Sequence, residues 1–190
     1  MQMRPDIQIK SVLKAMTDVV LPALDPTNQL AQEQVRLCMG LLDLLSRQMP
    51  LQFRFDCDEL RRLRAMGEDL LPLADPQVVG ARTLQTLGDA VRTSGDVLAR
   101  AQADPAEVVE SVRRLRAATG AVVQQACAGG MHSDTRRLEL VVLESSREQL
   151  LRDRTWLLSQ GWESDPKAFA PIESLLPSVR PNLPSSQDSR

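Results

Sequence analysis

The dipeptide Asp-Pro occurs four times in this 190-residue chain, at 25–26, 75–76, 104–105 and 165–166. The carboxylate of Asp accepts hydrogen bonds from the unpaired N–H groups of a helix's first turn, and Pro fits the first helical position because its missing N–H would have no partner there. Each Asp-Pro therefore predicts the start of a helix. At Asp104, Glu107 stands three residues later and completes a capping box.

Another helix start is predicted without a proline. In the segment FRFDCDEL, Asp56 and Glu59 have the spacing of a capping box, and Phe55 and Leu60 have the spacing of a hydrophobic staple. We therefore expect a helix to begin at residue 57.

Apolar residues that recur every three or four positions extend these starts into helices near 6–22, 26–48, 57–73, 76–102, 105–127 and 134–160. The second has the widest apolar face, which predicts the most buried helix. In the fourth, we expect Gly88 and Gly95 to let a neighbour approach closely. Aromatic residues make up only 3% of the chain, whereas sheets favour them. The fold class expected is all-α, with six helices packed as antiparallel hairpins in a bundle.

The end of the sixth predicted helix divides the chain. Gly161 is expected to cap it in a left-handed conformation, with Trp162 folding back on Leu157. Five prolines follow between 166 and 184, and the last residues are polar. We expect residues 1–162 to form the helical bundle domain and residues 163–190 an extended Pro-rich tail that is partly disordered.

Two segments fifty residues apart resemble each other: LKAMTDVVLPALDP at 13–26 and LRAMGEDLLPLADP at 63–76. One interpretation is an internal duplication that builds a tandem array of helical hairpins. The other is that a Leu-rich helix ending before an Asp-Pro start recurs because it uses the same turn chemistry. Both interpretations stay open at this point.

Composition excludes several classes of function. The formal net charge of −2 gives no basic field to hold nucleic acid, so no nucleic-acid partner is expected. Cys38, Cys57 and Cys127 form an odd set without close pairs, which argues against a disulfide framework. The N-terminus has no apolar run, and no segment approaches the length of a membrane span. We expect a cytoplasmic protein that has no membrane partner.

Motifs for common enzyme chemistry are missing from the sequence. It contains no G-x-G-x-x-G, G-x-x-x-x-G-K, H-E-x-x-H or C-x-x-C pattern. His132 is the single histidine, so the standard di-iron set with two Glu-x-x-His motifs is excluded. We expect no metal and no other cofactor, and we expect no catalytic residues.

The segment CAGGMHSDTRRLEL, at 127–140, is the best candidate for a ligand site. Glycines precede a predicted helix start that carries hydroxyls and cations, a combination that can hold a phosphate or carboxylate. The candidate residues are Gly129, Gly130, His132, Ser133, Thr135 and Arg136. The alternative is a loop in which Gly-Gly ends one helix and Ser or Asp begins the next.

A second candidate lies in the sixth predicted helix. Arg147 and Arg154 are seven residues apart and fall within the stripe that Leu143, Leu150 and Leu157 form. Such arginines either extend their charged heads into water, or pair with carboxylates across an interface, or neutralise an anionic ligand. The subunit interface is the interpretation favoured here.

The sequence therefore predicts a non-catalytic helical interaction or accessory protein, either self-associating or a regulatory subunit of another protein. A protein partner and a homo-oligomer are the expected partners. The alternative is a helical module that binds an anionic or amphipathic small molecule between the second and sixth helices.

Overall fold

The computed structural model describes residues 5–100, 104–129 and 133–176, with the side chains of 133–135 left out. The described residues contain no β-strand, so the prediction of an all-α protein is confirmed. The helices are α1 (Pro5–Ala15), α2 (Leu21–Ala23), α3 (Gln29–Gln48), α4 (Gln52–Leu70), α5 (Pro76–Val79), α6 (Ala81–Ala99), α7 (Pro105–Ala128), α8 (Ser133–Trp156) and α9 (Ile172–Leu175).

Three tighter or wider turns complete the described structure. A π-helical turn, η1 (Met16–Val20), joins α1 to α2, and two 3₁₀ turns, η2 (Leu158–Gln160) and η3 (Pro166–Ala168), follow α8. With the continuous run 5–23 counted as one helix, the described residues form eight α-helices instead of the six expected. The additional ones are the short α5 and α9.

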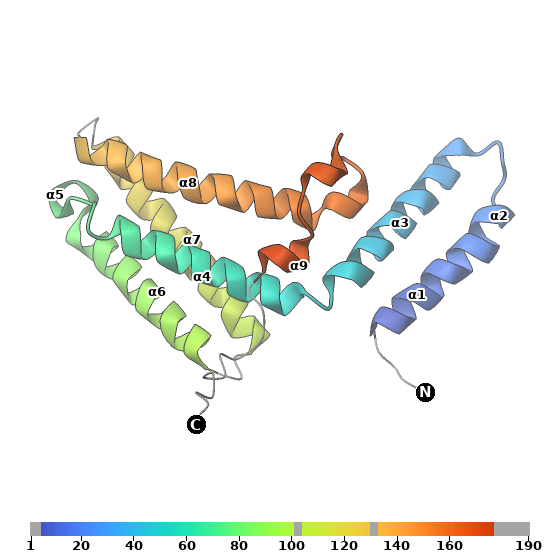
Figure 1. Cartoon of the computed structure of the whole chain (residues 1–190), viewed down its shortest axis with the longest axis horizontal. Coiled ribbons are helices and arrows are strands. Elements are labelled where there is room, and N and C mark those ends of the chain that lie inside the picture. Colours follow the sequence, from blue (N-terminus) through green and yellow to red (C-terminus); the bar gives the residue numbers. More distant parts are fainter. Residues whose placement is uncertain (1–4, 101–103, 130–132, 177–190) are drawn as a thin grey trace, which may run out of the picture.

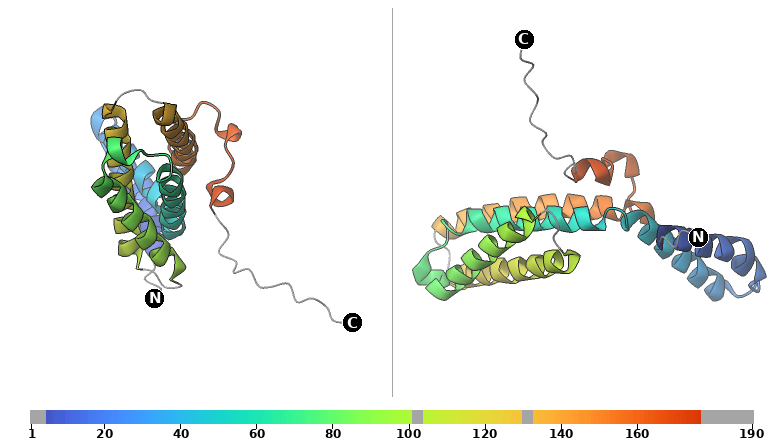
Figure 2. Two further views of the ribbon diagram at one scale, coloured as in Figure 1. Left: turned by 90° about the vertical axis from the view of Figure 1, so that its left-hand side faces the viewer. Right: turned by 90° about the horizontal axis from the view of Figure 1, so that it is seen from below.

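The helices are arranged in two parts (Figure 1). The four-helix core consists of α4, α6, α7 and α8, in which α7 packs along both α6 and α4, and α8 lies beside α4. The N-terminal hairpin consists of α1 and α3, which run antiparallel and project from the core at the end where α4 begins. The right-hand view of Figure 2 shows the same separation, with the hairpin at one end of an elongated molecule.

The apolar core lies among α4, α6 and α7. Its fully buried leucines and valines are Leu60, Leu70, Leu87, Val108, Leu115 and Val122. The hairpin contributes far less: of its described residues, only Leu44 is buried. The expectation that the second predicted helix is the most buried is therefore wrong for the single chain.

Glycine sets the distance between α4 and α6 at one point. A Cβ atom added to Gly67 would lie 2.7 Å from Cγ2 of Val91, so this close contact depends on the missing side chain. Gly95 also faces a close neighbour, Cζ of Arg64 at 3.3 Å, as the sequence predicted. The same prediction is wrong for Gly88, because no described atom lies within 4 Å of the corresponding Cβ position.

Three of the four Asp-Pro pairs begin a helical segment. Asp75, Asp104 and Asp165 each accept a hydrogen bond from the backbone N–H two residues later, at 2.8, 2.8 and 3.2 Å. The first pair behaves differently, because Asp25 accepts from the N–H of Thr27 within a turn. Asn28 then caps α3 by accepting from the N–H of Ala31 at 3.0 Å.

The predicted capping box at Asp56 is wrong. Helix α4 already begins at Gln52, so Asp56 lies inside the helix and accepts a hydrogen bond from the side chain of Gln52 at 2.9 Å. Burial raises the pKa of the Asp56 carboxyl above its ordinary value. Phe55 thus lies inside the helix, where its ring contacts that of Trp156, with ring centroids 4.2 Å apart.

The π turn of the hairpin precedes Pro22. In a regular α-helix the ring of Pro22 would meet the carbonyl of residue 18, and its missing N–H would leave that carbonyl without a bond. The wider turn Met16–Val20 changes the hydrogen-bond pattern, and the N–H of Leu21 donates to the carbonyl of Met16. Helix α1 and its continuation α2 can therefore run on to Ala23.

The C-terminal side of α8 is described as far as Leu176. Gly161 has a φ of 73°, which confirms the left-handed cap. Trp162 is 74% exposed, so the expected packing on Leu157 is wrong. Residues 163–176 lie in the predicted tail, and they contain η3, α9 and the buried Leu176; residues 177–190 lie outside the described residues. The duplication suggested by the repeated segments stays a prediction.

We expect Gly67→Ala to lower the free energy of unfolding by about 1–3 kcal/mol, because the added methyl overpacks against Val91. Val91 is buried and β-branched, so its methyl cannot rotate away freely. Urea denaturation measures this change.

The matched control is Gly88→Ala, also in a helix interior. It should raise the free energy of unfolding by roughly 0.5–1 kcal/mol, because alanine is the better helix former and meets no described atom. Equal effects of the two substitutions would contradict the close contact of α4 with α6.

Candidate functional site

The N-terminal hairpin exposes an apolar surface. Its half-exposed or exposed aliphatic side chains include two valines of the first helical run and four leucines of α3: Val12, Val19, Leu30, Leu37, Leu41 and Leu45. The exposed fractions lie between 48% and 68%, values typical of surface polar residues. We call this set the hairpin face.

The helical period places the two parts of the hairpin face beside each other. In α3, Val35, Met39 and Leu42 are partly covered and point toward α1. Leu30, Leu37 and Leu41 lie about 100–180° around the helix from them, on its far side, and Leu45 lies about a quarter turn away. In α1, Val12 lies about a quarter turn from the partly covered Ile9 and Leu13. Because the two helices are antiparallel, Val12 and Leu45 open toward the same side of the hairpin, and the other leucines extend this surface around α3.

Charged side chains lie at the edge of the hairpin face or farther around the helices. Lys14 pairs with Asp18 at 2.6 Å, and Arg47 pairs with Asp43 at 2.8 Å, each within its own helix. At 100° per residue around α3, Asp43 and Arg47 lie about 120° and 80° from Leu37. The six residues of the hairpin face carry no charge, and the exposed Glu33 lies at its edge, about 40° around the helix from Leu37.

The four-helix core contains a charge cluster in which Asp58, Glu59 and Arg152 are buried, while Arg62 and Arg116 reach the surface. Arg152 is 1% exposed and donates to Oδ2 of Asp58 at 3.0 Å. The Nε of Arg62 donates to the same oxygen at 2.7 Å, and Arg116 pairs with Glu59. The cluster therefore connects α4 to α7 and to α8.

The buried guanidinium of Arg152 has further partners. It donates to Oε1 of Gln149 at 2.9 Å, and its Cζ lies 4.2 Å from the ring centroid of Phe55, a cation–π distance. Buried charges are tolerated where they are paired in this way, and removing one partner leaves the others without compensation. The cluster therefore holds α8 in place against α4.

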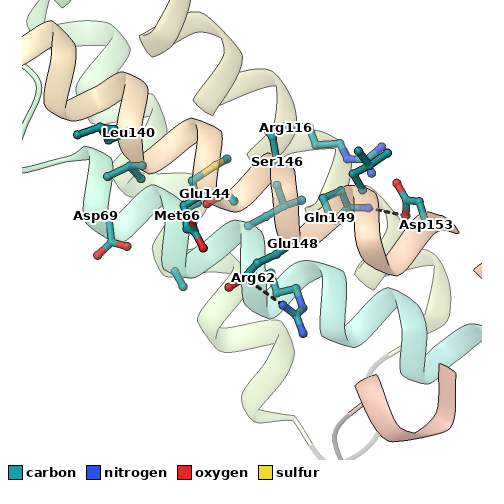
Figure 3. A pocket seen from close by; sticks show the side chains of 15 residues that line it. Arg62, Met66, Asp69, Arg116, Leu140, Glu144, Ser146, Glu148, Gln149 and Asp153 are labelled. Atoms are coloured by element: carbon teal, nitrogen blue, oxygen red, sulfur yellow. Dashed lines mark hydrogen bonds and ion pairs between the residues drawn. The ribbon is translucent and has the colours of Figure 1, made fainter. Parts of the chain in front are cut away.

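An open groove of about 770 Å³ lies between α4 and α8 (Figure 3). Its apolar lining includes Leu63, Met66 and Leu140. Its two arginines are engaged: Arg62 donates to Glu148 at 2.8 Å and to Asp58, and Arg116 pairs with Glu59. A cavity was expected between the second and sixth predicted helices. The groove lies instead between α4 and α8, which correspond to the third and the sixth.

Most residues of the anion site predicted from the sequence lie wholly or partly outside the described part of the structure. Gly130 and His132 lie outside the described residues, as do the side chains of Ser133 and Thr135. Gly129 has an ordinary φ of −75°, so the special backbone conformation expected there is wrong. What requires glycine is space, because an added Cβ would lie 2.2 Å from Cγ1 of Val78. Arg136, the sixth candidate, is exposed.

The two predicted interface arginines lie on the outer side of α8. Arg147 is exposed between Leu143 and Leu150, which are themselves 64% and 59% exposed. Arg154 binds Glu163 of the same chain through two hydrogen bonds of 2.8 and 2.6 Å, and it lies over the ring of Phe169. This pair holds the pKa of Glu163 below its ordinary value. The role of both arginines at an interface stays a prediction.

Sequence reasoning missed the buried side of α8. Its covered positions follow a heptad-like spacing that runs Leu138, Val142, Ser145, Gln149, Arg152 and Trp156. The row of leucines that includes Leu143 and Leu150 is the more apolar of the two and is therefore the more conspicuous in the sequence. The buried row contains the polar residues Ser145 and Gln149, and it ends at Trp156, which contacts Phe55. Spacing in the sequence does not reveal the partners of these residues.

Other reactive groups give no catalytic arrangement among the described residues. Burial raises the pKa of the Cys57 thiol, so it stays protonated near neutral pH. Within 5–100, 104–129 and 133–176, no three His, Cys, Asp or Glu residues gather as metal ligands would. None of the described helices has both the length and the apolar character needed to cross a bilayer.

Comparison with known proteins finds no matching family model, no similar curated protein and no similar solved structure.

We expect Arg152→Met to lower the free energy of unfolding by about 3–5 kcal/mol, because it leaves Asp58 and Glu59 buried with fewer cations. Methionine keeps much of the apolar stem, so the loss reports mainly the charge. Denaturant unfolding at neutral pH measures it.

Arg147→Met on the same helix is the control, since Arg147 is exposed. Its effect should stay within about 0.5 kcal/mol, the range of ordinary surface substitutions. Comparable losses in the two variants would show that burial of Arg152 does not determine the outcome.

Proposed function

We propose that this protein is a non-catalytic interaction protein whose four-helix core carries the N-terminal hairpin, and whose hairpin face binds a protein partner. The observation that carries the proposal is the exposure of the hairpin face. The helix with the widest apolar arc in the sequence, α3, buries a single described residue in the isolated chain. A helix with so wide an apolar face is typical of one whose exposed side is covered by another protein surface when the protein functions.

The free energy available from covering the hairpin face is substantial. Each of its aliphatic side chains is about half exposed, so complete burial contributes roughly 1 kcal/mol per side chain. Contiguous exposed apolar patches of this kind mark interaction sites on soluble proteins, whereas isolated ones do not. The absence of charge from the hairpin face favours a protein surface over a polyanion.

The core supports this role by being rigid where the hairpin is attached. Helix α4 follows α3 after a short turn, and its first two turns carry Phe55 and the two carboxylates of the charge cluster, Asp58 and Glu59. The side chain of Gln48, at the end of α3, donates to the carbonyl of Trp156 at 3.2 Å. A partner that binds the hairpin is thereby held at a fixed position relative to the core.

Photo-crosslinking in the cells that make the protein tests the proposal. Benzoylphenylalanine in place of Leu41, on the hairpin face, should give crosslinks to protein. The same group in place of Gln85, an exposed residue of α6, is the control and should give few. Equal yields at both positions, or crosslinks to lipid alone at position 41, would contradict the proposed function.

A second candidate function is the binding of a small molecule in the groove between α4 and α8. Its volume lies within the range of ligand pockets. Among the described residues, Asp69 and Glu144 line the groove without an ion pair, whereas both arginines are engaged. A cationic amphipathic molecule fits this lining better than the anionic ligand that the sequence suggested.

Native mass spectrometry of protein purified from its own cells tests this candidate. The spectrum should show a bound small molecule that is lost in the double variant Asp69→Asn/Glu144→Gln, because the two carboxylates no longer attract a cation. Glu110→Gln, on α7 outside the groove, is the control. A spectrum of unliganded protein, or a ligand that both variants retain equally, argues against the groove.

A further inference from the structure

We infer that the occupant of the hairpin face is the hairpin face of a second copy of this chain, so that two hairpins form an intermolecular four-helix bundle. This inference rests on the proposed function, because it names the partner that the hairpin binds. Three observations on the hairpin carry it: its lack of buried residues, its uncharged face and its size.

The first observation is that the hairpin is not self-sufficient. The helical run 5–23 packs against α3, yet no described residue in it is buried. Most of the stability of a helix in a protein comes from packing an apolar face against another element. The hairpin therefore gains stability from a further cover, and a second copy of the chain is a partner that every cell making the protein contains.

The second observation is the distribution of charge. A surface that binds its own copy meets every one of its own charges across a two-fold axis, and like charges near that axis repel. The hairpin face limits this problem because its six residues are all aliphatic, and its nearest charge, the exposed Glu33, lies at the edge beside Leu30 and Leu37. An aliphatic face with its charge at the rim brings few like charges together near the two-fold axis.

The third observation is size. Helix α3 has 20 residues, so the hairpin face is about 30 Å long, and two helices in contact make it roughly 20 Å wide. A footprint of this order approaches the ~800 Å² per partner that stable interfaces bury. Two such hairpins packed face to face give the left-handed four-helix arrangement, with crossing angles of about 20°.

The outer side of α8 is a less suitable contact for a second copy. Its leucines are as exposed as those of the hairpin, but Arg147 stands in the middle of the row. Burying that guanidinium would need a carboxylate on the other copy, and Arg154 already has Glu163. The contact that the sequence favoured at these arginines is therefore placed on the hairpin.

Analytical ultracentrifugation of the full chain tests the inference. The wild type should sediment as a dimer at micromolar concentration. Leu37→Gln/Leu41→Gln should weaken self-association by about tenfold or more, because it puts two amides into the interface. Leu143→Gln/Leu150→Gln, equally exposed on α8, is the matched control and should remain dimeric.

Energy transfer provides a second readout that does not depend on these variants. Cys38 is exposed on α3, next to the hairpin face, and Cys127 is exposed at the end of α7. Mixed chains that carry donor or acceptor at Cys38 alone should show strong transfer, and chains labelled at Cys127 alone should show less. A stronger signal at Cys127 overturns the inference.

Other outcomes separate this inference from the proposed function. A monomeric wild type at micromolar concentration, or a dimer that only the α8 variant dissociates, overturns the inference. If the monomer is nevertheless crosslinked through position 41 to a different protein in cells, the proposed function stands alone. If the monomer instead floats with vesicles of zwitterionic lipid, and no protein is crosslinked, both fail.

Discussion

The ion pair between Arg152 and Asp58 is the interaction on which the arrangement of the core depends. Arg152 is almost completely buried, and so is Asp58, so each charge requires the other. Through Asp58 and its neighbour Glu59, helix α4 receives cations from α8 and α7. An apolar contact could slide by a turn without great cost, whereas this pair has one register. The charge cluster thus fixes where α8 lies along α4.

That register in turn fixes the surfaces on either side of α8. With Arg152 turned inward, the leucines near Arg147 must face outward, and the groove between α4 and α8 has Glu148 on one wall, bound to Arg62. The same helix ends beside α3, where Trp156 accepts a hydrogen bond from Gln48. The position of the N-terminal hairpin therefore depends on the ion pair that fixes α8 against α4.

The sequence predicts the all-α class and several helix ends because these depend on neighbours in the chain. Asp104 followed by Pro105, and Gly161 after α8, act within one turn of backbone. Asp56 misleads, because a carboxylate three residues before Glu59 has the same spacing inside a helix as at its start. Arg152 could not be assigned, since its partner is 94 residues away. The leucines of α3 were predicted to be buried, and in the single chain Leu30, Leu37, Leu41 and Leu45 are exposed.

The salt bridge between Arg154 and Glu163 divides the molecule into parts that respond differently to acid. Because the pKa of Glu163 is lowered in the folded chain, the pair stabilises fully above the ordinary pKa of glutamate, and this contribution is lost as the pH falls through the lowered value. The apolar contacts among α4, α6 and α7 do not titrate. Acid strong enough to protonate Glu163 therefore removes this tie between α8 and the segment that carries α9, while the apolar contacts remain.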